Sequence, residues 1–162
     1  MGTVIAVTSG KGGTGKTSIT GGVAASLALM GHRVLCIDMD IGLRNLDITL
    51  GLSDRALMDF SDVALGRCPL ARGAVDHPDV KGLSLLTAPM SLSPSLTIDK
   101  VRAMLDTARG QYDYILIDSP AGLGAGFRLA ICGADRALVI ATNDASSLRD
   151  AQRTVCELES IR

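Results

Sequence analysis

Residues 10–17 have the sequence Gly-Lys-Gly-Gly-Thr-Gly-Lys-Thr, and this stretch decides the fold. The Val- and Ile-rich residues 3–8 before it predict a buried strand, and the Ala- and Leu-rich residues 16–30 after it predict a helix. A glycine loop between a strand and a helix is the setting in which the pattern G-x-x-x-x-G-K-[ST] binds phosphate. The flanking strand and helix argue against a simple glycine-rich surface turn.

The residues of this loop have distinct expected roles. Lys16 is predicted to reach the β- and γ-phosphates of a nucleotide, and Thr17 to offer its hydroxyl to Mg²⁺. The predicted nucleotide-binding residues are Gly10, Lys11, Gly12, Gly13, Thr14, Gly15, Lys16, Thr17 and Ser18. A loop that holds one nucleotide needs only one lysine, so Lys11 is either a solvated surface charge or a second functional lysine.

The composition of the 162 residues limits the classes of function. A net charge of −1 without a basic cluster argues against nucleic-acid binding, and an aromatic content of 2% argues against a base-stacking surface. No apolar run reaches the roughly 18 residues of a membrane span, and the chain begins in a predicted strand instead of a leader peptide. We therefore expect a cytoplasmic protein. The four cysteines are widely spaced, which favours free thiols over a disulfide framework or a metal site.

Strand-like and helical segments alternate along the chain. The expected strands are residues 3–8, 33–38, 83–87, 112–118 and 136–142, and the main expected helices are residues 16–30, 97–109, 124–132 and 145–161. Residues 55–65 also have helical spacing, and residues 69–75 are expected to add a short helix. This order predicts an α/β fold of the P-loop NTPase class, with a mostly parallel sheet flanked by helices on both faces. We expect a single P-loop ATPase domain over residues 1–162, truncated at its C-terminal side because five strands make a small sheet.

Two of the apolar strands end in carboxylates. Residues 33–38 end in Asp38, Asp40 follows two residues later, and residues 112–118 end in Asp118. Ligands of open α/β folds bind beyond the carboxyl ends of the strands, so we expect these side chains near the phosphate site. Asp118 has the position of a Walker B aspartate, which holds Mg²⁺ against nucleotide phosphates. For Asp38 and Asp40 the spacing alone leaves open that they only form a turn.

Four segments carry a resemblance to a known family. Residues 11–17, Lys-Gly-Gly-Thr-Gly-Lys-Thr, resemble the deviant Walker A motif of the ParA/MinD family of ATPases. Residues 38–47, Asp-Met-Asp-Ile-Gly-Leu-Arg-Asn-Leu-Asp, resemble switch I of its MinD branch, and residues 118–122, Asp-Ser-Pro-Ala-Gly, resemble its switch II. Residues 145–150, Ala-Ser-Ser-Leu-Arg-Asp, are similar to a segment of that branch at which partner proteins dock.

The resemblance implies the following residue roles. Lys11 reaches across a nucleotide-sandwich dimer to the partner's phosphates, so the implied catalytic residues are Lys11, Lys16 and Asp40, of which Asp40 orients the attacking water. Thr17, Asp38 and Asp118 are the implied magnesium-site residues. Asn45 and Asp150 are implied to lie on the dimer or partner surface. The same aspartate, Asp150, has an alternative as a solvated charge in the first turns of a helix.

The resemblance also implies an activity and partners. It implies a Mg²⁺-dependent ATPase that binds ATP and ADP, forms an ATP-sandwich homodimer and acts in placing the division site with MinC- and MinE-like regulators. The MinD branch has a C-terminal helix that binds the inner face of the cell membrane, and the 162 residues do not include such a segment. One alternative is a ParA-type ATPase that segregates DNA or plasmids or positions another cargo. Another is a relative of the nitrogenase iron protein, which requires paired cysteines at the dimer face.

Overall fold

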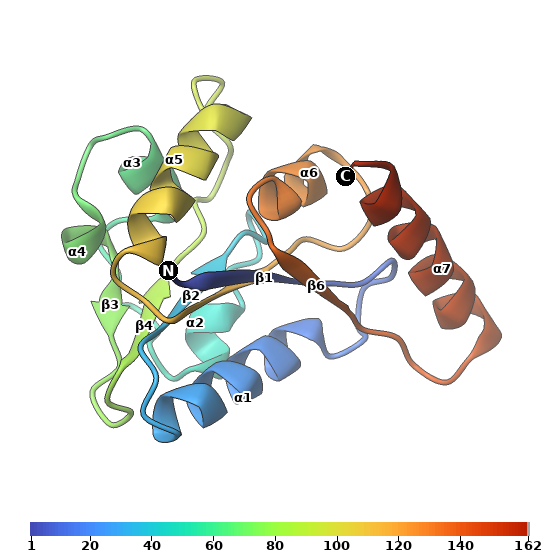
Figure 1. Ribbon diagram of the computed structural model, residues 1–162, viewed down its shortest axis with the longest axis horizontal. Helices are drawn as coiled ribbons and strands as arrows, with labels where there is room; N and C mark the ends of the chain where they lie inside the picture. Colours follow the sequence, from blue (N-terminus) through green and yellow to red (C-terminus); the bar gives the residue numbers. More distant parts are fainter. Residues whose placement is uncertain (162) are drawn as a thin grey trace.

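A six-stranded sheet forms the middle layer of the computed structural model, which describes residues 1–161 (Figure 1). The strand order is β3-β4-β2-β5-β1-β6. The strands are β1 (Thr3–Thr8), β2 (Val34–Asp38), β3 (Val75–Asp76), β4 (Leu83–Leu86), β5 (Tyr114–Asp118) and β6 (Arg136–Val139). All neighbouring pairs are parallel except β3 and β4, which are antiparallel. The expected α/β class with a mostly parallel sheet is therefore confirmed.

Helices cover both faces of this sheet (Figure 1). The helices are α1 (Lys16–Leu29), α2 (Leu46–Thr49), α3 (Phe60–Ala64), α4 (Leu70–Gly73), α5 (Ile98–Arg109), α6 (Ala125–Ile131) and α7 (Ala145–Ser160). Helices α1 and α2 pack on one face, and α3 to α6 pack on the other. Helix α7 follows β6 at the edge of the sheet, at the right of Figure 1. No helix among residues 1–161 is long and apolar enough to span a bilayer.

The core is aliphatic, as an aromatic content of 2% requires. On the α1 side of the sheet, Ala24 and Ala28 pack against strand residues such as Val34 and Leu116. On the other face, Phe60 and Leu105 pack against the β2 and β5 side chains. Burial of these side chains on both faces stabilises the sheet by roughly 1.5–3 kcal/mol for each large aliphatic residue. It also holds the carboxyl ends of β1, β2 and β5 in fixed positions.

The predicted segments that differ most from the structure lie in residues 55–75, while β5 begins two residues later and β6 ends three residues earlier than expected. Residues 55–65 were expected to be helical, but α3 begins only at Phe60, because the Asp59 carboxylate caps it by accepting the N–H groups of Ser61 and Asp62. Residues 69–75 were expected to form a short helix, but α4 ends at Gly73 and the chain then enters β3. This two-residue strand is the sixth strand of the sheet and was not expected.

The register of the parallel strands brings the predicted acidic residues together. Asp38 at the end of β2 pairs with Asp118 at the end of β5, and Asp118 pairs with Val7 of β1. The glycine loop leaves β1 immediately afterwards. The sheet therefore places the loop and both carboxylates at one edge.

Candidate nucleotide-binding site

The glycine loop connects β1 to α1 and leaves open space above the helix N-terminus. Gly13 and Gly15 have φ values of +74° and +86°, a left-handed conformation that side chains disfavour. A Cβ atom added at Gly12, Gly13 or Gly15 would meet no other atom within 4 Å. Gly15 is the N-cap of α1, so the unpaired N–H groups of the first helical turn face this space. Such an arrangement suits a phosphate group.

The loop borders a cavity of about 490 Å³. All of the predicted loop residues except Gly10 line it, and so do Asp40 and Asn45. Gly10 lies instead against Asp150 in α7. Four further residues line the cavity and were not predicted from the sequence, namely Ser9, Leu43, Pro120 and Ala121. Three of these lie in the segments 38–47 and 118–122, which the sequence analysis singled out as whole segments.

Lys16 and Thr17, which line the cavity, are hydrogen-bonded to Asp118 behind it. The Lys16 Nζ atom lies 2.9 Å from Asp118 Oδ1, and the Thr17 hydroxyl donates to Asp118 Oδ2 at 2.7 Å. Lys16 is 7% exposed and Asp118 is fully buried. A hydroxyl oxygen and carboxylate oxygens are ligands that Mg²⁺ prefers. The open loop and this oxygen donor set therefore fit a magnesium ion bound together with nucleotide phosphates.

Asp38 holds the segment that follows β2. Its two carboxylate oxygens accept the backbone N–H groups of Asp40, at 2.9 Å, and Leu46, at 3.2 Å. Burial, helped by the nearby Asp118 charge, raises the pKa of Asp38 to about 7, although the hydrogen bonds from the two N–H groups oppose this shift. Asp38 therefore holds the backbone of residues 40–46 through these two hydrogen bonds, and it does not line the cavity.

Asp40 is the carboxylate that lines the cavity. It is half-buried, and burial raises its pKa, which the Lys16 charge partly opposes. Among the predicted acidic residues, Asp40 is thus the one placed to contact a water molecule beside a bound phosphate. Asp38 was expected in the magnesium site, but both of its carboxylate oxygens accept backbone N–H groups, so its role there stays a prediction.

Lys11, Asn45 and Leu43 form the exposed rim of the cavity. The Lys11 carbonyl accepts a hydrogen bond from Ser9 Oγ at 2.7 Å, which fixes the backbone at the start of the loop. The Lys11 side chain forms none of the ion pairs found within residues 1–161. Lys11 and Lys16 therefore line the same cavity in two different environments, Lys11 exposed to solvent and Lys16 buried.

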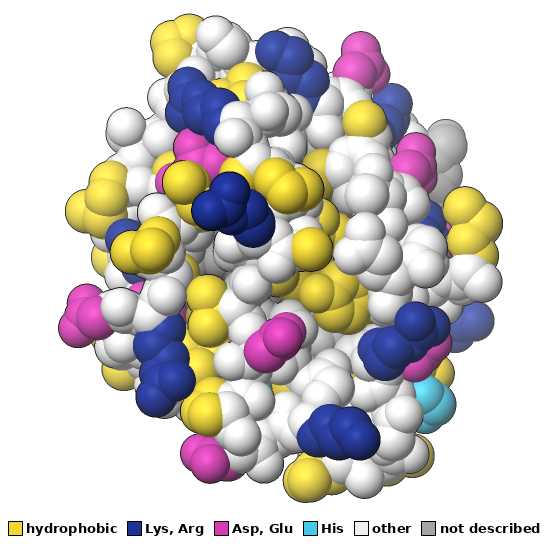
Figure 2. Space-filling model, turned by 90° about the vertical axis from the view of Figure 1, so that its left-hand side faces the viewer, with side chains coloured by type: hydrophobic (Ala, Val, Ile, Leu, Met, Phe, Trp, Pro, Cys, Tyr) yellow, Lys and Arg dark blue, Asp and Glu magenta, His cyan; other side chains and the backbone are white. Residues whose placement is uncertain are grey.

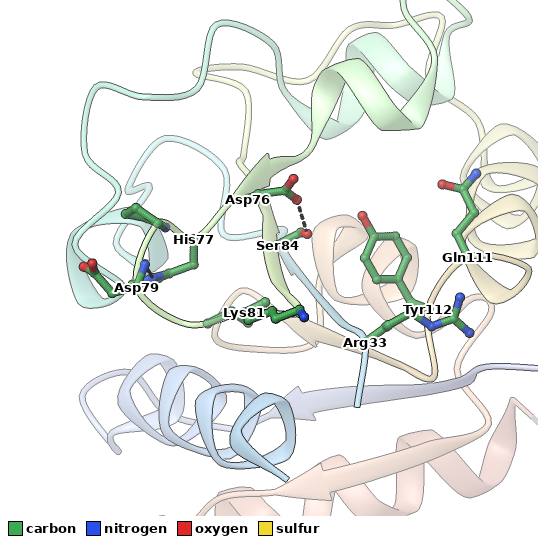
Figure 3. Close-up of a pocket in the computed structure, with 11 residues that line it drawn as sticks. Arg33, Asp76, His77, Asp79, Lys81, Ser84, Gln111 and Tyr112 are labelled. Carbon is green, nitrogen blue, oxygen red and sulfur yellow. Dashed lines mark hydrogen bonds between the residues drawn. The ribbon is translucent and has the colours of Figure 1, made fainter. Parts of the chain in front are cut away.

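A second cavity of about 500 Å³ lies at the amino ends of the strands, opposite the glycine loop (Figure 3). Asp76 and Ser84 are hydrogen-bonded at 2.7 Å, and the His77 Nε2 atom lies 3.0 Å from the Leu50 carbonyl oxygen. Arg33 forms an ion pair with Asp113. Because several of its polar side chains already have protein partners and ligands of this fold class bind at the opposite edge, this cavity is the weaker candidate.

The comparisons with known proteins agree with the geometry of the glycine loop. The profile of the AAA domain family matches residues 2–162. The chain belongs to this family. It is 46% identical to the septum site-determining protein MinD of Helicobacter pylori, over 96% of this chain and 58% of that protein. It is 38% identical to MinD of Bacillus subtilis, over 98% of this chain and 60% of that protein. The expected resemblance to the ParA/MinD ATPases is thus confirmed.

Solved structures give the same result. The MinC:MinD cell division protein complex of Aquifex aeolicus matches with a TM-score of 0.89 and 43% identity, over 98% of this chain and 64% of that chain. MinD of Pyrococcus horikoshii, complexed with Mg-ADP, matches with a TM-score of 0.86 and 28% identity, over 99% of this chain and 66% of that chain. The chain spans about 60% of the length of the curated relatives that it matches.

Proposed function

We propose that this chain is the nucleotide-binding part of a MinD-type ATPase that acts in division-site placement. It binds ATP with Mg²⁺ in the cavity of the glycine loop, and it pairs with a second copy while ATP is bound. The relatives named septum site-determining proteins support this assignment. The observation that carries it is the pair of lysines at one cavity, Lys16 buried beside Asp118 and Lys11 exposed at the rim.

The two lysines have different tasks in this proposal. Lys16 and the loop N–H groups hold the phosphates of the chain's own nucleotide, and Asp40 orients the attacking water. Lys11 places its charge on the nucleotide of the second copy. Bound magnesium supplies charge neutralisation at the phosphates, and Thr17 and Asp118 are the residues that would hold it. Catalysis then rests on positioning and electrostatics, so hydrolysis is expected to be slow without a partner protein.

The proposed partners are a second copy of this chain and MinC- and MinE-like regulators. The Aquifex aeolicus structure of a MinC:MinD complex supports the first of these regulators. Asn45, exposed at the cavity rim, and Asp150 in α7 are the proposed contact residues. The proposed location is the cytoplasm, at the inner face of the membrane where a full-length relative carries a membrane-binding helix.

A DNA-segregating role is not favoured by the charge distribution. Figure 2 shows Lys and Arg side chains interspersed with Asp and Glu over the face that includes α4 and the β3–β4 hairpin. The whole chain has a net charge of −1. Affinity for DNA depends on a basic surface that displaces counterions. This face does not offer such a surface.

Sedimentation velocity with Lys11→Ala tests the proposal. The parent is expected to dimerise with Mg²⁺ and a non-hydrolysable ATP analogue, because the Lys11 charge meets the second nucleotide only across the dimer. Lys11→Ala should dimerise far more weakly than the parent while it retains most of the monomer's nucleotide affinity. Lys81→Ala removes an exposed lysine beside the opposite cavity and serves as the matched control, expected to dimerise like the parent. If Lys11→Ala dimerises as well as Lys81→Ala, Lys11 does not cross to the second nucleotide.

A further inference from the structure

Gly10 is the only loop glycine that touches a distant helix. A Cβ atom added at Gly10 would lie 2.4 Å from the carbonyl oxygen of Asp150 and 2.7 Å from its Cβ atom. Asp150 lies in the second turn of α7. The backbone of the glycine loop and the backbone of α7 are therefore in direct contact, with no side chain between them. In Figure 1 this helix lies at the right-hand side, where the loop leaves β1.

This contact explains why position 10 holds glycine. Gly10 does not have a positive φ, unlike Gly13 and Gly15, so its backbone conformation is open to other residues. Gly12, in contrast, has free space within 4 Å. The space beside Gly10 is filled by α7, which is a requirement of packing and not of loop geometry.

Both sides of the contact are held firmly. On the loop side, Ser9 is fully buried and its hydroxyl donates to the carbonyl of Lys11 at 2.7 Å. On the helix side, the hydroxyl of the fully buried Thr154 donates at 2.9 Å to the same Asp150 carbonyl that faces Gly10. The outer face of α7 is open, with Leu148 53% exposed and Val155 41% exposed.

Lys11 also lies near the start of α7. The pKa of Asp144, the N-cap residue of α7, is lowered chiefly by a hydrogen bond from Thr142 and to a smaller extent by the charge of Lys11. The start of α7 thus interacts with the glycine loop in two ways. The backbone at Asp150 contacts Gly10, and the Asp144 carboxylate lies in the field of the Lys11 charge.

We propose that Gly10 is a positioning residue that couples the position of α7 to that of Lys11. Two backbones already in contact cannot approach further, so a shift of α7 at Asp150 moves Gly10 and, with it, the adjacent Lys11. In the other direction, a ligand that fixes the loop restrains the first turns of α7. The role of Lys11 rests on the proposed function, whereas the coupling between loop and helix does not.

Hydrogen exchange tests the coupling without any substitution. Adding Mg–ADP to the parent should slow amide exchange in residues 148–156 by on the order of tenfold, because the loop no longer allows α7 to open at Asp150. Helix α5, which packs against α3, α4, β1 and β5, is the internal control and should not change. Unchanged exchange in residues 148–156 at saturating Mg–ADP would overturn the proposal.

Variants on both sides of the contact complete the test. Gly10→Ala should speed exchange in residues 148–156 without ligand and should lose the Mg–ADP response there. Gly12→Ala, which adds the same methyl group where space is free, should show the parent's exchange pattern in the ligand-free protein. If Gly10→Ala no longer binds Mg–ADP, the exchange response of Thr154→Val is measured in its place. Thr154 lies in α7, outside the loop, and this substitution removes its hydrogen bond to the Asp150 carbonyl. Thr154→Val should reduce the Mg–ADP response at least threefold, and a parent-like response in either Gly10→Ala or Thr154→Val contradicts the coupling.

A double-substitution cycle distinguishes positioning from simple structural damage. If Gly10 acts through Lys11, then Gly10→Ala combined with Lys11→Ala should weaken ATP-dependent dimerisation no more than Lys11→Ala alone. Additive losses would contradict the proposal. A parent that stays monomeric with ATP would count against the proposed function alone, because the exchange experiment would still decide the coupling.

Discussion

Replacing Asp38 by asparagine should make the ligand-free protein more stable at alkaline pH. Asp38 is fully buried, and burial raises its pKa from 3.8 to about 7. The folded protein therefore binds one more proton than the unfolded chain between these two pH values. As a result, the Asp38 contribution to stability is complete below pH 3.8 and is lost as the pH rises to about 7.

The size of this effect follows from the same two pKa values. The difference between 3.8 and about 7 corresponds to about 4 kcal/mol, at about 1.4 kcal/mol for each pH unit. Asparagine stays neutral, but its amide nitrogen must face one of the two N–H groups, of Asp40 or Leu46, that Asp38 now accepts. That mismatch costs about 1 kcal/mol. Asp38→Asn should thus be more stable than the parent by about 3 kcal/mol at pH 8 and within about 1 kcal/mol of it near pH 4.

Urea unfolding at several pH values, with EDTA and without nucleotide, measures this difference. Asp113→Asn is the control, because the pKa of Asp113 is lowered by its hydrogen bond from Arg33. Its contribution has the opposite sign: it is present at neutral pH and is lost as the pH falls. If the stability of Asp38→Asn runs parallel to that of the parent from pH 4 to pH 8, the burial of an ionisable Asp38 does not act as reasoned here.

Two further predictions concern the other aspartates. Asp40→Ala should retain nucleotide binding and lose hydrolysis, whereas Asp118→Ala should weaken binding only when Mg²⁺ is present. Titration calorimetry with and without EDTA measures the binding, and a phosphate-release assay measures the hydrolysis. Asp54→Gly should raise the free energy of unfolding by about 0.5–1 kcal/mol in urea titrations, because Asp54 is exposed with a φ of +62°, which glycine adopts without steric cost. An unchanged or lower value for Asp54→Gly would contradict the strain at that position.

The sequence predicted the strand, loop and helix around residues 3–30 because one motif specifies all three. The glycines, the apolar strand and the Ala-rich helix are local signals that agree with each other. The carboxylates at the ends of β2 and β5 were likewise predicted to lie near the loop, since parallel strands end at one edge of the sheet. The register of Asp38 with Asp118 bears this out.

The segment 55–76 could not be predicted as well. Helical spacing in residues 55–65 is real, but the capping box of Asp59 starts the helix only at Phe60. The two-residue strand β3 forms by pairing with β4, and a strand of two residues carries no alternation to detect. Tertiary contacts and a local cap decided these boundaries.

Individual glycines and aspartates were also not separable from the sequence. The pattern gave Gly10 the same expected role as Gly12 and Gly13, yet only Gly10 packs against α7. Asp38 and Asp40 are two residues apart, yet one is enclosed by backbone N–H groups and the other lines the cavity. Such differences depend on which distant segment covers each residue.

The central claim is that the glycine loop binds Mg–ATP through Lys16, and isothermal titration calorimetry of the parent and Lys16→Ala tests it most directly. The parent should bind Mg–ATP, and Lys16→Ala should bind at least about 100-fold more weakly, because the substitution removes the positive charge that contacts the β- and γ-phosphates. Lys100→Ala, at an exposed lysine in α5, should bind like the parent, and circular dichroism should confirm that all three proteins are folded. A folded Lys16→Ala protein that binds Mg–ATP as tightly as the parent would contradict the account.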